Sequence, residues 1–204
     1  MTPADVFAVM EATWPPAAVQ RIGPWMIRDG AGGGKRVSAA TVEAEWTDAD
    51  LPLAESAMRG LGQDRLFLIR AGDAALDTAL AAHGYCIVDP VTVYACPVAD
   101  LAAPPGMTTF PHWPPLAIAR DLWAEGGIGA ARVAVMNRAA GPKTAILARN
   151  KDRPAGVAFV ALHGRHAMLH ALEIMPPSVG KVPRTTSCKR RRVGRWIMGP
   201  LRFR

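Results

Sequence analysis

The sequence predicts an α+β chain built from two subdomains. It has 204 residues, of which 50% are hydrophobic and 20% charged, so it is long and apolar enough to bury a core and is not a wholly disordered chain. Prolines cluster between residues 97 and 115, and we interpret residues 99–115 as a linker. The periodic segments on either side of it define a first subdomain, residues 1–98, and a second, residues 116–176.

The first subdomain mixes helices and strands. Thr2 and Pro3 form a helix start, and apolar residues recur at helical spacing until Trp14 and two prolines end the pattern. Asp50 and Asp73 are expected to start two more helices, which glycines end at positions 62 and 84. The strands are expected at residues 25–28, 36–39, 65–70, 85–88 and 91–96, and the last two runs are interpreted as two strands or as one kinked strand.

The second subdomain has a simple order of elements. Two helical segments, residues 116–125 and 130–138, come first. Strand-like runs follow at residues 143–149, 156–162 and 166–174, separated by short turns. Strands joined by tight turns pair antiparallel, so the three predict a meander.

This order, ending in Ala167-Met168-Leu169-His170-Ala171-Leu172-Glu173-Ile174-Met175-Pro176, resembles the GNAT superfamily of N-acetyltransferases. The resemblance covers residues 113–176, and residues 1–100 resemble the leader domain of some bacterial members. It implies a mixed or antiparallel sheet with flanking helices. It also implies transfer of an acetyl group from acetyl-CoA, the co-substrate, directly to a primary amine of a small molecule or peptide.

The resemblance also implies site residues on the last strand. In the family this strand splays from its neighbour, and its free backbone groups pair with the pantetheine arm, which assigns Leu172, Glu173, Ile174 and Met175 to cofactor binding. A carboxylate near this strand often takes the proton from the substrate ammonium, which makes Glu173 the candidate base and His170 a weaker one. The alternative for Glu173 is a solvated charge on a half-exposed strand. The family's acidic Tyr has no counterpart, because Tyr85 and Tyr94 both precede the linker.

The residues after the last strand depart from the family pattern. A loop of the form Arg/Gln-x-x-Gly-x-Gly/Ala, which opens a helix and holds the pyrophosphate, is expected there. Residues 177–183 read Pro-Ser-Val-Gly-Lys-Val-Pro instead. We back-translated the residues after Pro176 with one choice of GC-rich codons and read the result in the adjacent frame. The amino-acid sequence obtained contains glycine spacing of that kind, followed by an Ala-rich helix. We therefore expect a GNAT domain that is incomplete, truncated or frameshifted at its C-terminus and defective in turnover.

The charge changes at the same point. Residues 176–204 contain nine basic side chains and no acidic one, which leaves 15 basic and 17 acidic residues in the rest of the chain. The net charge of +7 therefore belongs to this basic tail, residues 177–204, which we expect to be disordered or out of frame. Two alternatives stay open. One is a nucleic-acid-binding protein that uses the tail, which we favour less than a tail that is out of frame, and the other is an acyl-CoA-binding pseudoenzyme.

Other features are given their simplest interpretation. Three cysteines without a CxxC pair and no apolar export or membrane segment favour a reducing, cytoplasmic setting. Cys86 and Cys96 are expected to be buried strand residues. His163, His166 and His170 are expected in a turn and on the sheet surface, with no metal. The run of glycines at residues 30–34 is interpreted as a hairpin turn between two strands and not as a phosphate loop. Neither the amine substrate nor the oligomeric state can be read from the sequence.

Overall fold

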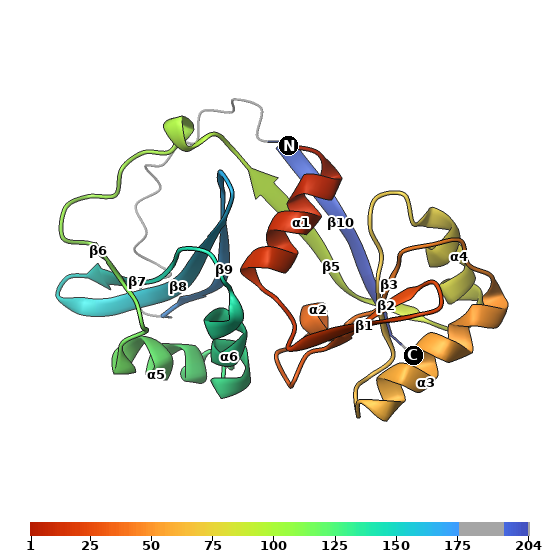
Figure 1. Ribbon diagram of the computed structural model, residues 1–204. Coiled ribbons are helices and arrows are strands. Elements are labelled where there is room, and N and C mark those ends of the chain that lie inside the picture. Colours follow the sequence, from red (N-terminus) through yellow and green to blue (C-terminus); the bar gives the residue numbers. More distant parts are fainter. Residues whose placement is uncertain (176–193, 204) are drawn as a thin grey trace. The chain divides into compact units, whose positions relative to one another are not determined.

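The computed structural model of the chain describes residues 1–175 and 194–203 (Figure 1). The chain divides into two compact units. The first contains Met1–Val6, Pro15–Tyr94 and Arg195–Arg204, and the second contains Phe7–Trp14 and Ala95–Gly194. The boundary between the units after Tyr94 lies close to the start of the proline-rich stretch. The sequence does not predict that residues 7–14 belong to the second unit.

The first unit contains two three-stranded sheets, ordered β1-β2-β3 and β4-β10-β5. Its elements follow in chain order: β1 (Ala18–Ile22), β2 (Trp25–Asp29), α2 (Lys35–Ser38), β3 (Thr41–Val42), α3 (Leu51–Gly60), β4 (Leu66–Leu68), α4 (Ala74–Ala82), β5 (Cys86–Ala95) and β10 (Gly194–Phe203). Its core packs aromatic rings edge to face, with Phe67 between Trp25 and Tyr85 at centroid distances of 5.3 and 5.5 Å. Trp25 donates its indole N–H to the carbonyl oxygen of Asp50, at 2.8 Å.

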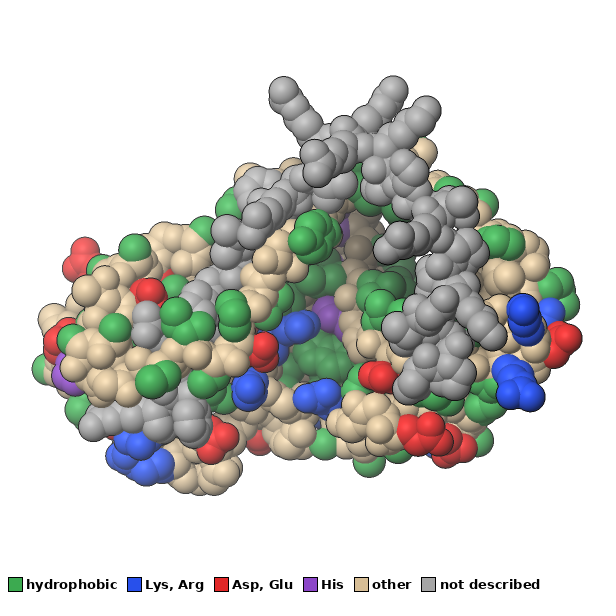
Figure 2. Space-filling model, turned by 180° about the vertical axis from the view of Figure 1, so that it is seen from behind, with side chains coloured by type: hydrophobic (Ala, Val, Ile, Leu, Met, Phe, Trp, Pro, Cys, Tyr) green, Lys and Arg blue, Asp and Glu red, His purple; other side chains and the backbone are tan. Residues whose placement is uncertain are grey.

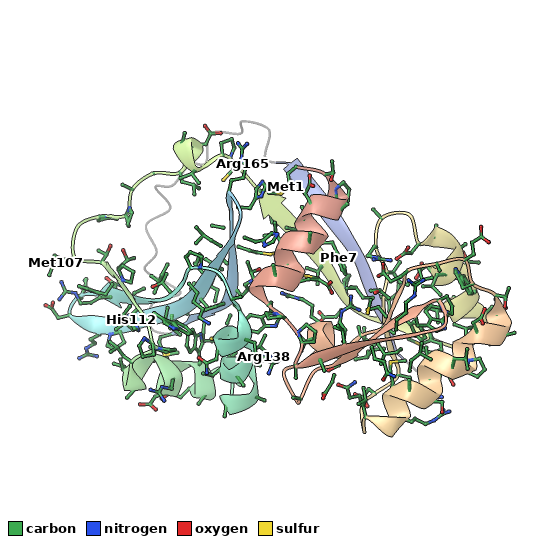
Figure 3. The ribbon with its side chains drawn as sticks, viewed as in Figure 1. Met1, Phe7, Met107, His112, Arg138 and Arg165 are labelled. Carbon is green, nitrogen blue, oxygen red and sulfur yellow. The ribbon has the colours of Figure 1, made fainter. Side chains whose placement is uncertain are left out.

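The second unit is a four-stranded antiparallel sheet, β6-β7-β8-β9, with helices on one face (Figure 1). Its elements are the greater part of α1 (Pro3–Thr13), then β6 (Thr109–His112), α5 (Ala117–Glu125), α6 (Ala130–Arg138), β7 (Lys143–Asn150), β8 (Arg153–His163) and β9 (His166–Ile174). Side chains fill the space between α5, α6 and the strands (Figure 3). This mixed α+β architecture, with antiparallel sheets and flanking helices, confirms the predicted fold class.

A lysine joins α6 to the sheet. Lys143, at the start of β7, donates from Nζ to the carbonyl oxygens of Asn137 and Ala139, each at 2.6 Å, and lies 4.9 Å from the ring centroid of Trp113. These carbonyls belong to the end of α6, where unpaired acceptors and the negative end of the helix dipole favour a cation. Desolvation by burial lowers the pKa of Lys143 from its ordinary value of 10.5.

Several sequence expectations need correction. Residues 36–39 do not form a strand, because Lys35–Ser38 is a short helix, so the glycine run connects a strand to a helix. β1 was not predicted, and the end of the proposed linker forms the edge strand β6. Cys86 and Cys96 are exposed and not buried. The tail is not disordered throughout, because Gly194–Phe203 is a strand whose residue Leu201 pairs with Leu68 of β4.

Candidate functional site

The pairing of β9 with β8 is interrupted near the end of β9. Phe159 pairs with His170, whereas Val157 pairs with Glu173. Two residues of β9, Ala171 and Leu172, therefore lie opposite Ala158 alone, which is the arrangement of a β-bulge. A bulge of this kind leaves one residue unpaired and changes which side chains of the strand face the core.

Ala171 carries the backbone distortion of the bulge. Its φ of 48° lies in the left-handed region that side chains with a Cβ rarely adopt. The other non-glycine residues with positive φ in the described part of the chain lie in turns and loops. The carbonyl oxygen of Ala171 accepts a hydrogen bond from Nε1 of Trp123, a fully buried residue of α5, at 2.8 Å. The distorted peptide is thus held by the helix that covers the sheet.

The bulge brings His170 and Glu173 to the same face of β9. Their partners, Phe159 and Val157, are two residues apart on β8 and therefore share a face, which is buried. In a regular strand, residues three apart face opposite ways. Neither the bulge nor this shared face could be read from the alternation of residues in the sequence.

His170 is a buried residue, 5% exposed, and not a histidine of the sheet surface. Its Nε2 lies 2.8 Å from Oγ1 of Thr13, and its ring stacks on Trp14 with centroids 5.0 Å apart. The Thr13 hydroxyl lies 2.6 Å from the carbonyl oxygen of Val9, to which it donates its single proton, so we assign His170 as the donor to Thr13. His170 thus fastens the end of α1 to β9.

Glu173 lies against the end of α5. A Cβ atom placed on Gly126, the residue that follows α5, would be 2.5 Å from Oε2 of Glu173. The lack of a side chain at Gly126 therefore makes room for the carboxyl group. Glu173 is partly exposed, and Gly126 begins the short connection to α6. The Glu173 carboxyl group therefore lies beside the α5–α6 connection and is partly accessible to solvent.

The end of β9 has one paired side and one free side among the described strands. The N–H of Met175 donates to the carbonyl oxygen of Ala155, and the carbonyl of Glu173 faces Gly156, where a Cβ would be 2.6 Å away. Since peptide groups alternate along a strand, those of Leu172 and Ile174 face the free edge. Their side chains are 55% and 42% exposed. The expected position of the pyrophosphate loop, residues 177–183, lies outside the described residues.

The remaining candidates do not join this site. His163 and His166 are paired with each other at the β8–β9 hairpin, and no group of three possible metal ligands occurs within residues 1–175. Tyr85 is buried and donates to Glu55, whereas Tyr94 is 71% exposed. No helix of the described residues is long and apolar enough to cross a membrane.

Sequence reasoning missed three residues of the site: Thr13, Trp123 and Gly126. Thr13 lies more than 150 residues before its partner His170, and no sequence signal connects the two. A tryptophan or a glycine at a helix end is an ordinary packing or capping residue. Only the tertiary structure shows that Trp123 and Gly126 contact the bulge and Glu173.

Comparisons with known proteins support the fold. No protein-family model and no curated protein matches the chain. A GCN5-related N-acetyltransferase from Kribbella flavida is structurally similar, with a TM-score of 0.59 at 15% identity over 88% of this chain and 75% of that one. A functionally unknown conserved protein from Staphylococcus epidermidis ATCC 12228 gives a TM-score of 0.56 at 8% identity over 89% and 78%. At such identities the likeness is one of fold: the chain has a GNAT-like fold.

Proposed function

We propose that the second unit binds acetyl-CoA along the free edge of β9 and derives from an N-acetyltransferase that acts on a primary amine. The observation that carries the proposal is the bulged edge strand, on which the peptide groups of Leu172 and Ile174 face outward beside the carboxyl group of Glu173. Unpaired peptide groups of an edge strand form hydrogen bonds with an extended ligand, and the two amides of a pantetheine arm suit such an edge. The similarity to the Kribbella acetyltransferase supports the same function.

Glu173 has the role of proton acceptor in this proposal. Acetyl-CoA supplies an activated acyl group as a thioester. Only a neutral amine attacks such a carbonyl carbon, so the ammonium form must first lose a proton, which Glu173 accepts. The amine nitrogen then bonds to the acyl carbon as the carbon–sulfur bond breaks and the coenzyme leaves as thiolate. The second proton of the nitrogen passes to this thiolate, which gives the neutral amide and free coenzyme A. His170 is buried against Thr13 and Trp14. We therefore assign it the role of positioning β9 and not that of proton acceptor.

Turnover by this chain is expected to be slow. The residues that follow Met175 do not contain the Arg/Gln-x-x-Gly-x-Gly/Ala pattern that supplies backbone amides to a pyrophosphate. Without these amides, acetyl-CoA is held by the strand edge alone. We therefore expect weak coenzyme binding and little acetyl transfer, so that in function the protein resembles an acyl-CoA-binding pseudoenzyme.

Isothermal titration of the full chain with acetyl-CoA tests the proposal. Binding in the micromolar to millimolar range is expected, and dephospho-CoA and free pantetheine should compete for the same site. Glu173→Gln should bind acetyl-CoA as the unaltered chain does and lose whatever acetyl transfer to primary amines is measured. Failure of acetyl-CoA at millimolar concentration to bind or to raise the melting temperature contradicts the proposal.

Charge gives only weak support to nucleic acid as the alternative partner. Residues 1–175 carry slightly more acidic than basic side chains, and both signs occur across the face in Figure 2. A protein that works through its tail would bind DNA with an affinity that falls steeply with salt and is lost when residues 177–204 are removed.

We also propose a cytoplasmic location, because Cys86 and Cys96 are exposed free thiols, which persist in a reducing compartment.

A further inference from the structure

We propose that Trp123 is a positioning residue that holds the β9 bulge and thereby sets the coenzyme-binding edge and the direction of Glu173. The inference rests on the proposed function for its coenzyme. Its structural part, that one indole N–H maintains the bulge, stands on the geometry of α5 and β9 alone.

The hydrogen bond is placed at the distorted peptide. Nε1 of Trp123 donates to the carbonyl oxygen of Ala171, the residue of β9 with φ of 48°. Alanine has no preference for the left-handed region, and a residue held there costs about 1 kcal/mol or more. Local sequence therefore does not maintain this conformation, and the fixed donor from α5 does.

The bulge matters because it sets the register of the last residues of β9. With it, Glu173 pairs with Val157 and faces the side that α5 covers. If the strand ran on regularly from His170, Glu173 would face the opposite side and the outward peptide groups would shift by one residue. Both features of the proposed site, the position of the carboxyl group and the free edge at Leu172 and Ile174, depend on this one irregularity.

The end of α5 contacts the strand at a second point. Gly126 leaves room for the Glu173 carboxyl group, one helical turn after Trp123 donates to Ala171. At the paired edge of the strand, Gly156 lets the β8 backbone approach the carbonyl of Glu173. The residues that carry the proposed chemistry are therefore contacted on one face by the end of α5 and along one edge by β8.

The test compares Trp123→Phe with Trp25→Phe in the full chain. Trp25, in the first unit, is also fully buried, and its Nε1–H donates to a backbone carbonyl at 2.8 Å. Each variant therefore loses one buried indole and one hydrogen bond of the same kind. We expect Trp123→Phe to weaken acetyl-CoA binding at least tenfold and to speed amide hydrogen exchange at residues 171–175. Trp25→Phe should leave both within twofold of the unaltered chain.

General loss of stability in the second unit needs its own control. Val135 of α6 is fully buried, and Val135→Ala should lower the melting temperature without changing coenzyme affinity. Should Trp123→Phe fail to fold, Trp123→Phe with Ala171→Gly is the second variant, because glycine adopts positive φ at no steric cost and should restore part of the lost affinity.

The outcomes separate the inference from the proposed function. Equal exchange at residues 171–175 in Trp123→Phe and Trp25→Phe overturns the inference, whatever the coenzyme does. Faster amide exchange in Trp123→Phe than in Trp25→Phe supports the inference that Trp123 maintains the bulge. If the unaltered chain then fails to bind acetyl-CoA, the inference about the bulge stands and the proposed function is wrong. A change in affinity that Val135→Ala reproduces also overturns the inference.

Discussion

The hydroxyl group of Thr13, in the last turn of α1, lies 2.8 Å from Nε2 of His170 in β9, and both residues are buried. This contact joins the first helix of the chain to the strand that carries the proposed site. Because a buried ring nitrogen without a partner costs free energy, the pair fixes both the rotamer of His170 and the end of α1.

Thr13→Val removes this partner with little change of shape. The free energy of unfolding of the second unit should fall by about 1–3 kcal/mol, because the buried hydrogen bond between Thr13 and His170 is lost. Urea unfolding followed by amide exchange in β9 measures the loss. Thr78→Val is the matched control, since its hydroxyl also donates to the carbonyl four residues earlier, at 3.0 Å, but is exposed. Equal losses in the two variants would contradict the role of His170.

Ala171→Gly should stabilise the second unit, by about 0.5–1 kcal/mol, because glycine adopts a φ of 48° without the strain that alanine carries there. The opposite sign is expected for Ala161→Gly, at a buried position of β8 that is not among the positive-φ residues. Thermal melting compares the two. A loss of stability in Ala171→Gly as large as that in Ala161→Gly would show that the bulge is not a strained feature.

Gly156→Ala should destabilise the second unit by about 1–3 kcal/mol, because the added methyl group would lie 2.6 Å from the carbonyl oxygen of Glu173 and would force β8 from β9. Gly106→Ala is a suitable comparison: no atom lies within 4 Å of the added carbon, and Gly106 is not among the glycines with positive φ. Urea denaturation should show little change for Gly106→Ala. The prediction fails if both variants unfold at the same urea concentration.

Lys143→Met should lower stability at neutral pH by about 1 kcal/mol, because the carbonyls of Asn137 and Ala139 lose their cationic donor at the end of α6. Circular dichroism during urea titration measures this loss. Arg59→Met, which removes an exposed side chain in the last turn of α3, should cost less.

The contribution of Lys143 should also depend on pH. Its pKa in the folded protein is lowered by desolvation, so between that value and 10.5 the unfolded chain binds more protons than the folded one. Stability from this group therefore rises with pH across that interval and is constant below it. The neutral amine keeps two N–H groups for the same two carbonyls. The difference in unfolding free energy between the unaltered chain and Lys143→Met should grow at alkaline pH, and a difference that shrinks there contradicts this assignment.

Elements with strong local patterns were predictable from the sequence. The helix at residues 130–138 and the three strands of the meander follow from apolar periodicity and short turns, and the structure confirms them. β1 was missed because most of its side chains are exposed and it lacks an apolar alternation. The pattern at residues 36–39 predicts a strand, yet Lys35–Ser38 forms a helix after the left-handed glycine at 34. Short segments are decided by their surroundings and not by propensity.

The sequence by itself determined the α+β fold class and the meander, because side-chain period and turn residues act over a few positions. Glu173 became a candidate base through the resemblance to the GNAT superfamily, and its role stays a prediction. The tertiary structure decided that His170 is buried against Thr13 and that β9 bulges at Ala171 beneath Trp123. Both depend on contacts between residues far apart in the chain. Such contacts are selected by the packing of whole elements, which no local pattern encodes.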